Sequence, residues 1–141
     1  RDNRSYSKAL VAIKAAKNLF PQRTDLDDLT QEINELYRLE RVLILNKRAV
    51  ESVRHDKWSE AENYYRKALE LQNTNSEALI GLKLSEEILS HIAIFRDFLE
   101  RPSRLTDPAV AAYAEDVLNS SSRHSSRSLL LGSLRTEVTI L

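Results

Sequence analysis

The chain has 141 residues, in which 21 lysines and arginines balance 21 aspartates and glutamates, and it contains no cysteine. The balanced charge gives no field that would attract nucleic acid, and the lack of cysteine excludes disulfides, thiolate metal sites and a cysteine nucleophile. This length suits one domain, and because the sequence starts at Arg1 and lacks methionine, we expect residues 1–141 to be a fragment of a longer protein.

Only two glycines and three prolines punctuate the sequence, which favours helices over strands and hairpins. Apolar residues at helical spacing, followed by Pro21, predict a first helix over residues 5–20. Acidic residues after Thr24 suit the positive end of a helix dipole and predict the start of a long second helix. The further predicted helices follow in chain order, and serine-rich residues 119–128 are the most loop-like stretch. We therefore predict an all-α protein with helices at about 5–20, 26–54, 58–72, 77–100, 107–119 and 126–141.

The two longest predicted helices, at 26–54 and 77–100, each carry two apolar stripes. A helix with two apolar stripes packs against neighbours on two sides, so we expect both helices to be buried twice over. On the helix at 26–54, one stripe consists of Leu29, Ile33, Leu36, Leu43 and Val50, and the other consists of Leu39, Val42, Ala49 and Val53.

Two short helices share a pattern at an offset of 52 residues, which separates Tyr6 from Trp58. Each has an aromatic residue followed by alanines at helical spacing, and small alanines let a neighbouring helix approach closely. The matching positions are Tyr6, Ala9, Ile13 and Ala16 in the first helix, and Trp58, Ala61, Tyr65 and Ala68 in the second.

Residues 56–82 resemble a joint between two tetratricopeptide (TPR) repeats, because Trp58, Ala61, Tyr65 and Ala68 match the family's second helix. The resemblance implies a TPR-like solenoid or bundle of antiparallel helical hairpins, in which short helices alternate with long ones, and it implies that Trp58 and Tyr65 belong to the core. The sequence departs from the family at Asn73, where proline is usual, at Asp56, where glycine is favoured, and at Lys83, where a small residue packs between helices.

Residues 101–118 and the helix after them are similar to helical regions between a membrane anchor and a PEGA-type domain in some bacterial envelope-associated proteins. That resemblance implies a place in the bacterial cell envelope, through an anchor outside this fragment. The fragment itself is not predicted to enter a bilayer, since its longest apolar runs, residues 42–45 and 92–95, fall far short of about 20 residues.

Residues that would carry chemistry do not form a recognisable site in the sequence. His55, His91 and His124 lie far apart and none belongs to a His-x-x-x-His pair, so no metal site is predicted, and His91 is expected at the edge of packing. Neither a Gly-x-Ser-x-Gly elbow nor a glycine-rich phosphate loop is present. We therefore predict no catalytic residue, no cofactor and no enzymatic activity.

The TPR resemblance implies a groove lined by the long helices, and it places the partner-binding surface there. We predict a protein–protein interaction or scaffold module whose partner is a peptide, a neighbouring domain or a second copy of the chain, with no nucleic-acid partner. The alternative is a structural spacer or homo-oligomerising stalk of a membrane-anchored bacterial protein. The candidate surface residues are Asn46, Val50, Arg54, Tyr64, Ile80, Leu84 and Glu87.

Overall fold

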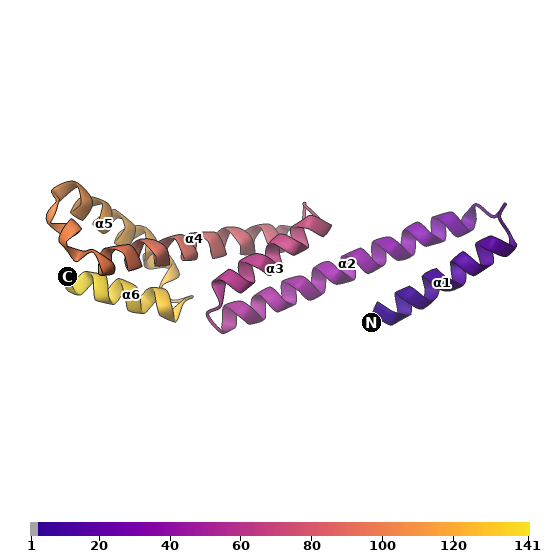
Figure 1. The fold of residues 1–141 in the computed structure, drawn as a ribbon, viewed down its shortest axis with the longest axis horizontal. Coiled ribbons are helices and arrows are strands. Elements are labelled where there is room, and N and C mark those ends of the chain that lie inside the picture. The colour runs from indigo at the N-terminus through magenta and orange to yellow at the C-terminus, as the bar shows by residue number, and fades with distance from the viewer. Residues whose placement is uncertain (1–2) are drawn as a thin grey trace.

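The computed structural model describes residues 3–141, and within that range the chain forms six α-helices and no sheet (Figure 1). Successive helices pack as antiparallel neighbours, which confirms the predicted all-α class. The elements are α1 (Asn3–Leu19), α2 (Asp25–Arg54), α3 (Trp58–Leu71), α4 (Ser76–Glu100), the short 3-10 helix η1 (Pro102–Thr106), α5 (Pro108–Ser121), the 3-10 helix η2 (Ser122–His124) and α6 (Leu129–Ile140).

The molecule is elongated, with two parts that share the long helix α2 (Figure 1). Residues 3–40, here called the arm, contain α1 folded back along the first half of α2. Residues 41–141, here called the body, contain the second half of α2 and the helices α3 to α6. The arm projects from the body, and α1 packs along the first half of α2, which contacts the end of α3 through Arg38 Nη1 and Leu71 O (3.0 Å).

A joint of small residues holds α2, α3 and α4 together. Its buried apolar members are mostly alanines, and they include Ala61 and Ala68, as the sequence pattern predicts. Gly81 of α4 lies so close to the ring of Tyr65 that a Cβ at position 81 would overlap the ring. The small residue between these helices is therefore Gly81, two positions before Lys83, where the TPR pattern expects it. The cluster consists of Val42, Ala49, Ala61, Tyr65, Ala68 and Ala78.

A second core of larger side chains lies between the second half of α4 and the carboxy-terminal helices. Phe95, Ile88 and Leu131 are fully buried there. Trp58, which is only 2% exposed, begins α3 and belongs to this core, so it links the joint to the carboxy-terminal helices. The expected burial of Trp58 and Tyr65 is thus confirmed. The other buried members are Ile92, Phe98, Ala114, Val117, Leu134 and Val138.

Asp56 ties the turn between α2 and α3 to the start of α6. Its φ of 58° lies in the left-handed region, which glycine adopts most readily and aspartate tolerates better than most residues. Its carboxylate accepts hydrogen bonds from Trp58 Nε1 (2.6 Å), Ser128 Oγ (2.6 Å) and the backbone N–H of Leu130 (2.8 Å). Asp56 therefore adopts the strained backbone conformation of the turn, and its side chain caps α6, which lies more than seventy residues further along the chain.

The serine-rich stretch at residues 119–128 is more helical than the sequence predicts. Helix α5 continues to Ser121 and η2 follows at once, whereas α6 begins at Leu129, three residues later than expected. Serine hydroxyls donate back to carbonyls three residues earlier, as Ser122 Oγ does to Asn119 O (2.7 Å), and this keeps the chain in helical turns. The side chain of Ser128 then accepts from Leu131 N (3.1 Å) and caps α6.

Candidate functional site

Helix α2 exposes a straight apolar seam, which we define as Leu29, Leu36, Leu43 and Val50. The four residues follow one another at intervals of seven, nearly two helical turns, so they lie along one face for about 32 Å. They are 41%, 43%, 64% and 43% exposed. The prediction that this stripe is buried is therefore wrong for the seam residues, although Ile33 beside them is half-buried.

The exposure of the seam follows from where the neighbouring helices contact α2. Helix α1 packs on the side that carries Leu26 and Tyr37, since the rings of Tyr6 and Tyr37 lie 5.5 Å apart. Helix α3 packs on the side that carries Val42 and Ala49, which is the second predicted stripe. The seam runs between these two contacts, and neither helix covers it.

A hollow of about 550 Å³ lies along the carboxy-terminal half of the seam. Leu43 and Val50 contribute apolar walls, Glu40 and Lys47 of α2 add one charge of each sign, and Glu77 comes from the first turn of α4. An apolar strip flanked by opposite charges is typical of a surface that receives another helix. The remaining lining residues are Ile44 and Asn46.

Asn46 lies at the floor of this hollow and joins α2 to the start of α4. It is 2% exposed, and its Nδ2 donates to Asn75 Oδ1 at 3.0 Å. The same Asn75 oxygen accepts from Ala78 N (2.9 Å) and thereby caps α4. The predicted contact residue Asn46 thus fixes the approach of the two long helices, and with Val50 it lines the hollow.

The other predicted surface residues do not join this hollow. Arg54 is exposed beyond the end of the hollow, and its Nη1 lies 3.5 Å from Glu51 Oε2. Tyr64 lines a separate hollow that includes His55. Ile80 is 70% exposed on α4, and Leu84 packs against the carboxy-terminal core. The seven predicted residues therefore do not form one surface.

Leu43 is the most exposed seam residue, and the predicted site omits it. Sequence reasoning assigns it to a buried stripe, and apolar residues at such spacing look the same whether their own chain covers them or not. The signal that identifies it is the uninterrupted interval of seven from Leu29 to Val50, which is the repeat of a helix that pairs with another helix.

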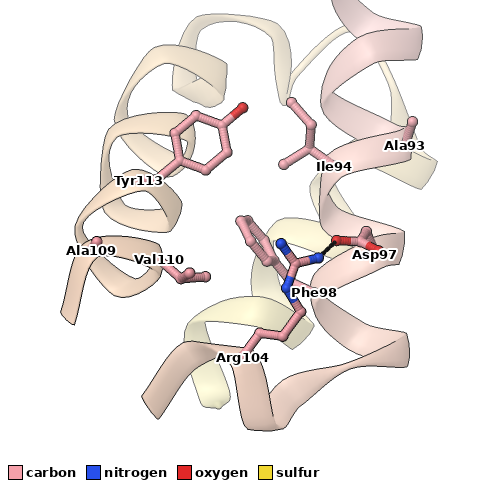
Figure 2. A pocket seen from close by; sticks show the side chains of 8 residues that line it. All are labelled: Ala93, Ile94, Asp97, Phe98, Arg104, Ala109, Val110 and Tyr113. Carbon is pink, nitrogen blue, oxygen red and sulfur yellow. Dashed lines mark hydrogen bonds and ion pairs between the residues drawn. The ribbon is translucent and has the colours of Figure 1, made fainter. Parts of the chain in front are cut away.

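A second hollow, of about 400 Å³, opens between α4 and α5 (Figure 2). Figure 2 shows Val110 and Tyr113 of α5 facing Ile94 and Phe98 of α4 across an apolar space. The charged groups at its edge bind each other, because Arg104 Nη1 lies 2.6 Å from Asp97 Oδ2. The hollow is thus suited to an apolar side chain, while its acid and base neutralise one another. Its other lining residues are Ala93 and Ala109.

Two histidines that are distant in sequence meet beside Glu87. The rings of His91 and His124 lie 5.9 Å apart, and His124 Nε2 donates to Glu87 Oε2 at 2.9 Å. His124 is 5% exposed, so the predicted contact residue Glu87 serves as an internal partner of the η2 turn. Burial lowers the pKa of His91 and the nearby His124 lowers it further, whereas Glu87 acts in the opposite direction.

Over residues 3–141 no cluster of three or more histidine, aspartate or glutamate side chains has an arrangement that would hold a metal ion. In the same range no helix combines the length and apolar character needed to span a bilayer. Comparisons with protein-family models, with curated proteins and with solved structures give no match to this chain.

Proposed function

We propose that this chain is a non-enzymatic protein interaction module and that the seam on α2 is its binding surface. The observation that carries the proposal is the row of four exposed large apolar residues at intervals of seven. Exposed apolar surface of this extent is costly in water, and proteins that retain it use it to bind other proteins. The mechanism is burial of the seam against a partner helix.

The finer architecture that we propose is a TPR-like joint built from α2, α3 and α4. The buried Ala61 and Ala68, the contact of Gly81 with Tyr65, and the left-handed turn at Asp56 support it. Short and long helices alternate across the joint, with 30 residues in α2, 14 in α3 and 25 in α4. The long first helices carry surface beyond the joint, and the seam lies on one of them.

The non-enzymatic part of the proposal is supported by two pairs of ionisable groups that bind each other. Asp97 and Arg104 neutralise each other, and Glu87 is engaged with the buried His124. A general acid or base needs a group that is free to exchange a proton with a substrate. An interaction surface requires no such group.

A photo-crosslinking residue placed at position 43 in the cell tests the seam. We expect it to form crosslinks to protein that a crosslinker at position 41 does not form, because Arg41 is also exposed but lies about 200° around α2. Both variants should retain the helical circular dichroism of the native chain. Equal crosslinking at the two positions, or none at either, would contradict the proposed binding surface.

An elongated spacer that pairs with another chain is the second candidate, and the arm that projects from the body favours it (Figure 1). In that case the seam joins identical chains, and no other ligand exists. The spacer candidate allows no partner other than this chain, so a crosslink from position 43 to any other protein would exclude the spacer.

A further inference from the structure

We infer that the partner of the seam is a second copy of this chain, bound antiparallel about a two-fold axis that passes at Leu43. This inference rests on the proposed function of the seam and names the occupant. Leu43 is the most exposed seam residue and lines the α2 hollow. A two-fold axis there places Leu43 of each copy against Leu43 of the other.

The part of the seam from Leu36 to Val50 matches itself when reversed about Leu43, and Leu29 lies beyond this matched part. Leu36 and Val50 are each seven residues from Leu43, so the axis brings Leu36 of one copy against Val50 of the other. Seven residues are nearly two turns, and all three side chains therefore face the same direction. The contact therefore has a central layer, in which Leu43 meets Leu43, and two equivalent outer layers, in which Leu36 meets Val50.

A charged pair extends the same symmetry. Glu32 lies eleven residues before Leu43 and Arg54 lies eleven residues after it, which is about three turns in each direction. Both side chains are exposed in the single chain. The antiparallel register therefore places Glu32 of each copy opposite Arg54 of the other, and this gives the predicted contact residue Arg54 a specific role.

The overall charge of α2 favours the same direction. Residues 25–40 contain six carboxylates and one arginine, whereas residues 41–54 contain four lysines and arginines and one glutamate. Antiparallel pairing places the acidic half of one copy over the basic half of the other. Parallel pairing in register would instead place Glu32 against Glu32 and Arg54 against Arg54, so the charges oppose it.

Single cysteines test the register directly, because the native chain contains none. We expect Leu43→Cys to form a disulfide-linked dimer on mild oxidation. Leu36→Cys alone and Val50→Cys alone should remain unlinked, while an equal mixture of the two should link. Linking by Leu36→Cys alone, at the yield of Leu43→Cys, would overturn the antiparallel arrangement.

Sedimentation across a concentration series tests the dimer and its charges without a crosslink. We expect the native chain to dimerise and Leu43→Glu to weaken the dimer at least tenfold, with Ile80→Glu as the control, since Ile80 is 70% exposed and lies outside the seam. Glu32→Arg and Arg54→Glu should each weaken the dimer severalfold. The double variant with both substitutions should dimerise with a dissociation constant within about twofold of the native one, because the two charges of each pair have changed places.

A native chain that remains monomeric at all concentrations up to the millimolar range would overturn the self-association. The proposed function would survive that result if a crosslinker at position 43 still captured a different protein in the cell. Loss of both the dimer and the position-specific crosslink would remove the seam as a binding surface. Failure of the two-fold pairing and failure of the proposed function are thus separate outcomes.

Discussion

The arm and the body of this molecule are built from the same kind of helix but have very different interiors. In the arm, the most buried side chains are those of Tyr6, Ile13 and Leu26. Each still keeps part of its surface exposed to solvent, at 9%, 8% and 7%. In the body, Phe95, Ile88 and Leu131 are completely buried between several helices. Two helices side by side cannot enclose a side chain, whereas three or more can. The body should therefore account for most of the stability.

Phe95→Ala should produce the largest loss and would test the body directly. The ring is fully buried, so its removal leaves a cavity, and we expect a loss of about 3–5 kcal/mol in the free energy of unfolding. Urea unfolding followed by circular dichroism measures it. Tyr6→Ala is the matched change in the arm and should leave the main transition unaltered. An equal shift for both variants would show that arm and body unfold as one unit.

Asp56→Ala should cost about 1–3 kcal/mol, because it removes the acceptor of three hydrogen bonds, from Trp58 Nε1, Ser128 Oγ and Leu130 N. Asp107 is a fitting control, since its side chain also caps a helix but accepts only locally, from Ala109 N at 2.9 Å. Asp107→Ala should cost about 1 kcal/mol or less. If the two alanine variants have the same midpoint in urea, the link between the turn and α6 has no stabilising role.

Gly81→Ala should destabilise the joint by about 1–3 kcal/mol, because the added methyl group would overlap the ring of the buried Tyr65. Gly132→Ala provides the control, since the nearest atom to a Cβ there is Ser125 O at 3.3 Å and alanine is the better helix former. Thermal unfolding of both variants measures the difference. If Gly81→Ala did not lower the unfolding temperature, α3 and α4 could move apart to fit the methyl group without loss of stability.

The stability of the body should decrease as the solution becomes acidic. The pKa of His91 is lowered in the folded state relative to 6.5, because burial and the neighbouring His124 disfavour its charged form. The neutral form of His91 therefore makes its full contribution to the free energy of unfolding above pH 6.5, and this contribution is lost as the pH falls through the pKa of the folded state. Urea midpoints at pH 7.5 and pH 5 measure the effect. His91→Gln should reduce the difference between them, and an unchanged difference would assign the pH dependence to other groups.

Lys17→Ala should have the smallest effect, and it tests the arm. Lys17 binds Asp27 at the end of the hairpin between α1 and α2, and both side chains are about half exposed, at 46% and 55%. An exposed ion pair contributes about 1 kcal/mol or less, and salt screens it. Amide hydrogen exchange should therefore become slightly faster in α1 and remain unchanged in α4. Faster exchange in α4 would show that the arm supports the body.

Local patterns in the sequence predict the helices and the joint, because these depend on neighbours a few residues apart. The spacing of Ala61 and Ala68 is enough to predict a close helix contact, and the backbone of Pro21 is enough to predict the end of the first helix. The ion pair of Lys17 and Asp27 joins the end of the first helix to the acidic start of the second.

Features that depend on how distant segments meet were not predictable in the same way. Nothing in the local sequence shows that His124 would contact Glu87, or that Asp56 would cap α6. The predicted surface included Arg54 and Val50 but omitted Leu43, because periodicity shows that a stripe is apolar and does not show whether its own chain covers it. The prediction of a loop at residues 119–128 was wrong in part, because the serine hydroxyls bind backbone carbonyls three residues earlier and keep the chain helical.

The carboxylate of Asp56 also sets an order of events while the chain is being synthesised. Its turn between α2 and α3 emerges from the ribosome long before Ser128 and Leu130, which lie 72 and 74 residues further along the chain. Until those residues appear, Asp56 holds a left-handed backbone without two of its three hydrogen bonds. The joint of α2, α3 and α4 should therefore be provisional during translation, and arrival of α6 should lock a turn that was made first.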